Sequence, residues 1–233
     1  MRIWITRTQP GATRLAEVLL KAGHIPWVRP VIEIQPLEVP PLHERFDVGV
    51  VLSEHGAHFG ARLLQQADQV LAVGEATRRT LEKLQISALT PRISSSEGLL
   101  EMAELSRANT SVLIVSGERP RTLLAQTLEQ RGSRVALCSV YRRVPVAISL
   151  DDPDQIDGIV IASGEGFENT ARWWHEAGGS SSVPVFVPSA RVARLGAELK
   201  MPVSIDCHSA EPEAVLAAID NYQREQHDRS PRR

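Results

Sequence analysis

The sequence repeats a pattern of strands and helices, and this repeat restricts the fold more than any other feature. Three units in the first half of the 233 residues are followed by three similar units in the second half. The matched stretches are residues 2–34 with 112–144, those that begin at residues 46 and 156, and those that begin at residues 73 and 187. Asp47 and Ser53 hold the same positions in their unit as Asp157 and Ser163 in theirs. Two similar halves are therefore expected.

Each unit alternates a strand pattern with a helix pattern, as the first unit shows. Residues 3–6 form a short apolar run, which is typical of a buried parallel strand. Leu15, Val18 and Leu19 then recur at helical spacing, and residues 26–34 return as a strand. Strands that alternate with helices form parallel sheets with helices on their faces. The sequence therefore predicts an α/β fold with two similar parallel-sheet domains.

Two stretches without periodicity mark the best places to divide the chain. Residues 35–44 are rich in proline, and residues 145–155 combine proline with aspartates. Division at these stretches predicts one continuous and one discontinuous domain. Their limits are residues 37–140 for the first, and residues 1–34 with 146–225 for the second. A tandem division near Asn109 is the alternative, although that region has little linker character.

Two short segments are predicted to connect these domains. They are residues 30–36 and residues 139–145, which correspond to each other in the repeat and are expected to pair beside a cleft between the domains. Tyr141, one of two tyrosines in the chain, is expected to end a strand in the second connector. Residues 227–233 are polar and charged, so a disordered tail is expected there.

Composition excludes several classes of protein. A net charge of -2 and an aromatic content of 4% do not suit a nucleic-acid binder. No apolar run approaches the roughly 20 residues that span a membrane, and residues 2–7 already resemble a strand rather than a signal peptide. A cytoplasmic protein is expected. Cys138 and Cys207 form no CxxC pair and are predicted to be small buried side chains.

The predicted ligand site lies in the loops that follow the strands, because ligands of parallel α/β sheets bind at the carboxyl ends of the strands. These loops are rich in hydroxyl groups and lie next to helix starts, where backbone N–H groups suit carboxylates or phosphates. The candidate residues are Arg7, Ser53, Gly74, Thr77, Ser116, Gly117, Ser163 and Ser189. Arginines in or beside the loops are Arg7, Arg119, Arg121, Arg142, Arg143 and Arg191. Helix capping is the alternative for each serine, but the set favours a ligand with several anionic groups.

Familiar catalytic motifs are missing from the sequence: it contains no GxGxxG, Walker A, GxSxG or HExxH pattern. Tyr141 could direct its hydroxyl into the cleft, or it could be a packing residue. His55 and His58 share a helix face, but no further carboxylate or cysteine completes a metal site, and an exposed loop is the alternative.

Several short motifs, in their order along the chain, resemble those of the uroporphyrinogen-III synthase family. They are residues 5–10, 30–34, 73–77, 96–100, 140–144 and 209–213. The resemblance extends over about residues 2–222. It implies two α/β domains joined by a two-stranded connection. It also implies an enzyme without a cofactor that cyclises hydroxymethylbilane, a linear tetrapyrrole with eight carboxylates, and inverts its last ring through an azafulvene and a spiro intermediate.

The resemblance also implies roles for particular residues. Tyr141 matches the family's cleft tyrosine and would supply the proton to the departing hydroxyl, while Thr77 and Ser189 match hydroxyl positions that contact the substrate. Ser53 matches the serine of a Thr-Ser loop, although Leu52 replaces the threonine. The alternative is a two-lobed regulatory module that binds a tetrapyrrole or another polyanion without turnover. Neither a nucleic acid nor a membrane is an expected partner. A cleft that must flex suits a monomer. Transient contact with the preceding enzyme of the pathway is possible for such a protein.

Overall fold

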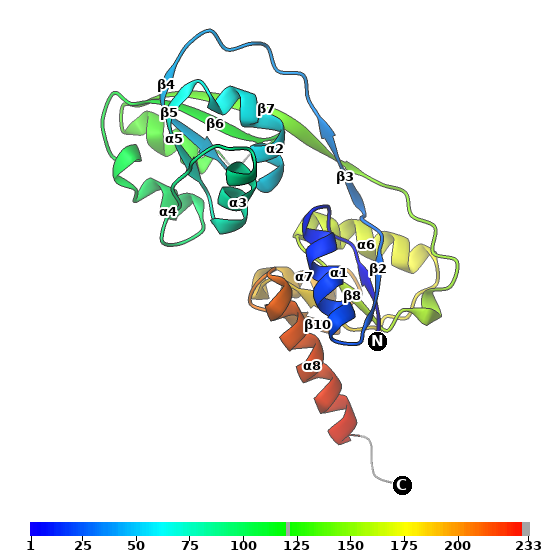
Figure 1. Ribbon diagram of the computed structural model, residues 1–233. Helices are drawn as coiled ribbons and strands as arrows, with labels where there is room; N and C mark the ends of the chain where they lie inside the picture. The colour runs from blue at the N-terminus through cyan, green and yellow to red at the C-terminus, as the bar shows by residue number, and fades with distance from the viewer. Residues whose placement is uncertain (120–121, 230–233) are drawn as a thin grey trace. The chain divides into compact units, whose positions relative to one another are not determined.

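The computed structural model of the protein describes residues 1–119 and 122–229, which form two compact units (Figure 1). Unit 1 comprises Met1–Glu33 and Val144–Arg233, and unit 2 comprises Ile34–Arg143. The chain thus passes from one unit to the other twice, next to the predicted breaks at residues 35–44 and 145–155. In the described part of the chain, no helix is long and apolar enough to cross a membrane.

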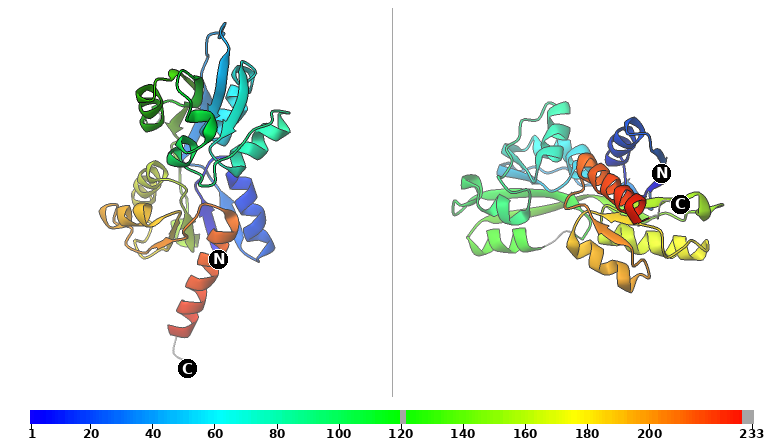
Figure 2. Two further views of the ribbon diagram at one scale, coloured as in Figure 1. Left: turned by 90° about the vertical axis from the view of Figure 1, so that its left-hand side faces the viewer. Right: turned by 90° about the horizontal axis from the view of Figure 1, so that it is seen from below.

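Unit 1 is a parallel sheet with helices on both faces. Its strands are β1 (Arg2–Ile5), β2 (Ile25–Val28), β8 (Gly158–Val160), β9 (Val185–Val187) and β10 (Ser204–Asp206), in the order β10-β9-β8-β1-β2. Its helices are α1 (Gly11–Lys21), α6 (Gly164–Glu176), α7 (Ala190–Glu198), α8 (Pro212–Arg229) and the short η2 (Pro153–Gln155). Ile3 and Ile5 face α1 and α8, which lie side by side (Figure 2). Trp4 points to the other face, where its ring lies 6.3 Å from that of Trp174 in α6.

Unit 2 has the same two-faced construction. Its strands are β3 (Ile32–Pro36), β4 (Phe46–Val51), β5 (Ala67–Ala72), β6 (Ser111–Gly117) and β7 (Arg134–Pro145), in the order β3-β7-β6-β4-β5. Its helices are α2 (Glu54–Leu64), α3 (Glu75–Lys83), α4 (Ser96–Leu100), α5 (Leu123–Gln130) and the short η1 (Ala103–Leu105). Leu113 and Val115 of β6 pack on the side of α2 and α3, whereas Val112 and Ile114 pack on the side of α4 and α5.

The strand orders of the two sheets confirm the internal repeat. The order β10-β9-β8-β1-β2 in unit 1 corresponds to β5-β4-β6-β7 in unit 2, with a single parallel bridge between Leu71 and Leu89 in the place of β10. Apart from that bridge at Leu89, residues 86–90 form no strand. The α/β class predicted from the sequence is confirmed, with two sheets whose strands are mainly parallel.

The two matched aspartates hold neighbouring strands together at their amino ends. The Asp47 carboxylate accepts hydrogen bonds from the backbone N–H and the hydroxyl of Ser111, both at 2.7 Å. The Asp157 carboxylate accepts one from the backbone N–H of Arg2 at 2.6 Å. Asp47 lies in β4 and Asp157 directly precedes β8, so in each unit the bond joins that strand to its neighbour in the sheet, β6 or β1. The two hydrogen bonds from Ser111 lower the pKa of the Asp47 carboxyl, and the bond from the backbone N–H has the larger effect.

The connecting segments differ in detail from the prediction. A predicted strand at residues 26–34 is split into β2 and β3, and β7 runs without a break to Pro145 rather than ending at Tyr141. Hydrogen bonds from Leu37 N to the Val140 carbonyl and from Val146 N to the Val31 carbonyl, both 3.0 Å, give β3 and β7 opposite directions. Because β3 and β7 form hydrogen bonds with each other's backbone, both segments that connect the two units are extended.

Three further predictions can be compared with the structure. Helix α8 includes residues 227–229, so the tail predicted to be disordered begins inside a helix, and residues 230–233 lie outside the described residues, as does Arg121. Cys138 and Cys207 are buried free thiols, as predicted, and burial raises the pKa of Cys207 to about 12.

The Asp47 bond predicts a pH-dependent effect of the substitution Asp47→Asn. The folded state lowers the pKa of this carboxyl, so its stabilisation is complete above the unfolded value of about 3.9 and is lost as the pH falls through the folded value. Urea unfolding should show a less stable variant at pH 7 and a difference that shrinks toward pH 3. Asp68→Asn is the control, because Asp68 pairs with Arg45 on the surface, where ion pairs contribute little. A difference for Asp47→Asn that does not change with pH would contradict this account.

Candidate active site

Four of the predicted residues meet at the carboxyl edge of the sheet in unit 2. Val51 of β4 pairs with Val115 of β6, so Ser53 and Gly117 each lie two residues beyond a paired position. Gly117 in turn pairs with Tyr141 of β7 across a register shift at Ser116 and Gly117. The bulge brings the phenol ring beside the end of β6, next to Ser53.

Ser53 connects the start of a helix to Tyr141. Its extended backbone (φ -168°, ψ 162°) makes it the N-cap of α2, and its hydroxyl accepts a hydrogen bond from Gly56 N at 3.0 Å. The same hydroxyl lies 3.0 Å from the Tyr141 hydroxyl, and either oxygen can be the donor. Ser53 therefore links the backbone of α2 to the phenol of β7.

Tyr141 is packed inside unit 2, with 2% of its surface exposed. Arg143 donates a hydrogen bond to the Tyr141 hydroxyl at 3.3 Å, and its guanidinium carbon lies 5.6 Å from the centre of the ring. A Cβ atom at Gly117 would stand 2.6 Å from the phenol, so glycine is required at this contact. The packing alternative for Tyr141 is thus confirmed for the ring, while its hydroxyl ends a short hydrogen-bonded chain.

The start of α3 forms the neighbouring part of the edge. Gly74 is its N-cap, and a Cβ atom there would meet the Ser94 hydroxyl at 2.8 Å. Thr77, in the first turn, is buried, and among the described residues its hydroxyl makes no hydrogen bond. Glycine at position 74 therefore lets the backbone at the start of α3 approach Ser94 closely.

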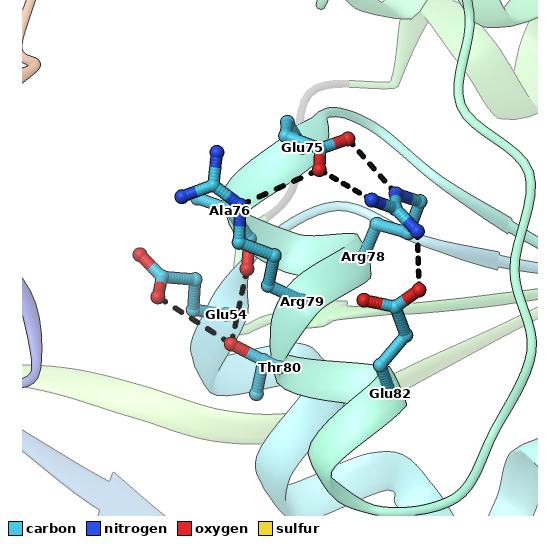
Figure 3. A network of polar contacts seen from close by, with 7 residues as sticks. All are labelled: Glu54, Glu75, Ala76, Arg78, Arg79, Thr80 and Glu82. Atoms are coloured by element: carbon cyan, nitrogen blue, oxygen red, sulfur yellow. Dashed lines mark hydrogen bonds and ion pairs between the residues drawn. The ribbon is translucent and has the colours of Figure 1, made fainter.

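A network of charged side chains covers the outer surface of α3 (Figure 3). The Glu75 carboxylate accepts hydrogen bonds from Arg78 Nε at 2.8 Å and Arg79 Nε at 3.4 Å, and Arg78 also pairs with Glu82. The Arg78 bond is the main cause that lowers the pKa of Glu75 to about 2. Glu75 is therefore ionised at neutral pH and holds two arginines near the start of α3.

The predicted residues of unit 1 lie at the carboxyl edge of their own sheet. Ser163 caps α6 by accepting a hydrogen bond from Gly166 N at 3.1 Å, and Ser189 caps α7 by accepting one from Val192 N at 3.4 Å. Arg7 follows β1, where its guanidinium donates to the Ala210 carbonyl at 2.8 Å and covers Gly11. Capping is thus confirmed for Ser53, Ser163 and Ser189, and a ligand role for them stays a prediction.

The remaining candidate residues differ in their surroundings. Ser116 is buried within β6 and donates to the Gly117 carbonyl at 3.2 Å, so it does not lie at a helix start. Arg142 points to Gln35, whereas Arg143 on the opposite face of β7 reaches Tyr141. Among the residues that the structure describes, no group of three or more potential ligands could hold a metal ion, so His55 and His58 remain without a third ligand.

Sequence reasoning missed the aromatic surroundings of Tyr141. The ring of His55 lies 5.5 Å from that of Tyr141 at 64°, and the ring of Phe59 lies 6.4 Å away. These two residues are four positions apart in α2, a spacing that places them on one face of the helix. The sequence shows this spacing, but it does not show which strand that face of α2 contacts.

Comparison with known proteins decides the family. The model of the family described as uroporphyrinogen-III synthase HemD matches residues 13–217, which is most of the chain. The chain belongs to the uroporphyrinogen-III synthase family. The uroporphyrinogen-III synthase of Salmonella typhimurium is 29% identical over 250 residues, covering 94% of this chain and 100% of that protein.

Solved structures of this family share the fold. The Helicobacter pylori uroporphyrinogen-III synthetase covers 95% of this chain and 100% of its own, with a TM-score of 0.62 and 14% identity. A mutant uroporphyrinogen III synthase from the extremely thermophilic bacterium Thermus thermophilus covers 98% and 99%, with a TM-score of 0.60 and 18% identity. Family membership confirms the enzyme class expected from the motifs and does not favour a binding module without turnover.

The two matched serine caps predict a difference in stability between Ser53→Ala and Ser163→Ala. Each variant loses a cap worth about 1 kcal/mol, and Ser53→Ala also removes a partner of the buried Tyr141 hydroxyl, which adds about 0.5–1.5 kcal/mol. All four tryptophans lie in unit 1, so tryptophan fluorescence reports the unfolding of that unit and circular dichroism that of both. Equal losses in the two variants would show that the Ser53–Tyr141 bond adds no stability.

Proposed function

We propose that this chain catalyses the cyclisation of hydroxymethylbilane to uroporphyrinogen III. Family membership over residues 13–217 supports the reaction. The observation that carries the proposal is the tyrosine hydroxyl at the strand ends of unit 2, bonded to a helix-capping serine and an arginine. The substrate loses one water and its redox state is unchanged, so the reaction needs no electron acceptor.

The carboxylates of the substrate would bind at the helix starts of each unit. The residues proposed as contacts are Arg7, Ser53, Gly74, Thr77, Ser116, Gly117, Ser163 and Ser189. The N-termini of α2, α3, α6 and α7 present backbone N–H groups at the carboxyl edges of the two sheets. Helix N-termini favour negative charge, so these edges suit the carboxylates of a linear tetrapyrrole. Ser116 would contribute through its backbone, because its side chain is buried in β6.

Tyr141 is proposed to protonate the departing hydroxyl of the first ring. The bond from that ring's methylene carbon to oxygen breaks, water leaves with the proton from Tyr141, and a positively charged azafulvene that keeps its pyrrole N–H proton remains. Ser53, which is hydrogen-bonded to Tyr141, can donate its hydroxyl hydrogen bond to the phenolate oxygen as the phenol gives up its proton. Arg143, already a donor to the phenol oxygen, would stabilise the negative charge that develops there.

The second task of the enzyme is to select the isomer. The last ring attacks through its substituted carbon to give the spiro intermediate, which fragments and closes again to the type III product with release of a proton. Uncatalysed closure gives the type I isomer, so the enzyme must hold the last ring in the orientation that leads to inversion. We further propose that the protein acts as a monomer that contacts the preceding enzyme of the pathway transiently.

The isomer assay tests this function directly. Freshly made hydroxymethylbilane is incubated with the protein, the product is oxidised, and the type I and type III porphyrins are separated. The proposal predicts type III product in large excess over a control without enzyme. Only type I product above the background would contradict it and would leave the binding module as the better interpretation.

Tyr141→Phe should slow turnover far more than it destabilises the protein. The variant keeps the ring and its packing but loses the hydroxyl, and a side-chain acid contributes about 10²–10⁴-fold to a rate. Tyr222→Phe is a matched control, because Tyr222 is the only other tyrosine and packs against Phe186 in unit 1. Initial rates and thermal unfolding are measured for both variants. A Tyr141→Phe variant with full activity would assign the proton to another group or to solvent.

A further inference from the structure

His55 occupies a place beside Tyr141 that the proposed reaction does not use. It lies in the first turn of α2, two residues after the cap Ser53, and its ring meets the Tyr141 ring nearly edge-on at 5.5 Å. Phe59, one turn later, lies against the same phenol at 6.4 Å. One face of α2 thus provides a wall of two rings for Tyr141, and all of these residues belong to unit 2.

The charged groups around His55 favour its neutral form. Burial lowers the pKa of its imidazole most, and the positive charges of Arg143 on β7 and His58 on α2 lower it further, while Glu54 on α2 opposes them. Tyr141 is the other titratable group that faces it. The imidazole is therefore neutral at pH 7 and becomes charged only below its ordinary value of about 6.5.

A charged imidazole would disturb the packing of the phenol. Arg143 already places a guanidinium 5.6 Å from the Tyr141 ring and donates to its oxygen. A second cation beside it would be repelled by Arg143 and would gain by moving into water, since the site is largely buried. Its departure would remove one of the two rings that hold Tyr141 against Gly117 and Ser53.

We propose that His55 is a positioning residue that holds Tyr141 in place only while its imidazole is neutral, so that protonation of His55 releases the phenol and lowers turnover. This inference rests on the proposed function, because it gives His55 the task of orienting Tyr141, the residue proposed to donate the proton. It also makes a claim about Tyr141 that does not depend on activity.

The activity-independent test uses the small number of tyrosines. With ¹³C-labelled tyrosine the protein gives ring signals from Tyr141 and Tyr222 alone, and Tyr222→Phe assigns them. The Tyr141 signal should shift between pH 7 and pH 5 with a midpoint below 6.5, and the shift should vanish in His55→Gln. His58→Gln is the matched control: His58 lies one turn on in α2 against Phe59, and its variant should keep the transition. A Tyr141 signal that stays constant in the unchanged protein, or that shifts equally in His55→Gln, overturns the inference.

The second test is the pH profile of turnover. In the unchanged protein the rate of type III formation should fall about tenfold per pH unit below the pKa of His55, as for a single titrating group. His55→Gln should be slower at pH 7 but should lose this acid limb, whereas His58→Gln should retain it. Should His55→Gln fold poorly, His55→Phe keeps a ring beside Tyr141 and should likewise show no acid limb.

The results separate the two proposals. Absence of type III product from the unchanged protein contradicts the proposed function, and the tyrosine signals then still decide whether His55 positions Tyr141. Type III product with an acid limb that persists in both His55 variants contradicts the positioning role alone. Unfolding adds a further check: below pH 6.5 the unfolded chain binds a proton at His55 more readily than the folded chain does, so stability falls there, and His55→Phe should remove this component.

Discussion

The hydrogen bond between Ser53 and Tyr141 joins the two kinds of element from which unit 2 is built. Ser53 belongs to the turn that ends β4 and begins α2, and Tyr141 belongs to β7, two strands away in the sheet order. Gly117 pairs with Tyr141 across a register shift in β6, and a Cβ atom on Gly117 would occupy the space of the phenol ring. The proposed chemistry therefore depends on a backbone irregularity as much as on a side chain.

Much of the fold could be predicted because the same pattern of strands and helices occurs twice in the sequence. The matched aspartates Asp47 and Asp157 make equivalent bonds to neighbouring strands, and the matched serines Ser53 and Ser163 cap equivalent helices with nearly the same backbone angles. Strong local signals, such as an N-cap serine before a helical pattern, can be recognised without knowledge of the tertiary structure. The order of the strands follows once the two halves are recognised as repeats.

The parts that could not be predicted depend on contacts between distant segments. β7 continues past Tyr141 because β3 lies beside it, and no local signal in residues 139–145 separates a continuous strand from a hinge. Adjacent arginines leave opposite faces of that strand, so the choice of Arg143 over Arg142 as the partner of Tyr141 follows from its register. The sequence indicates for His55 a metal ligand or an exposed loop residue, because its contact with a ring almost 90 residues later in the chain cannot be read from α2 alone.

Whether Ser53 and Tyr141 act as one unit is the claim on which the account depends most. A double-mutant cycle of Ser53→Ala and Tyr141→Phe, followed by the rate of type III product formation, measures their coupling directly. If the serine acts only through the phenol, the double variant should be no slower than Tyr141→Phe alone. Two effects that multiply in the double variant would show that the residues act independently and would contradict the account.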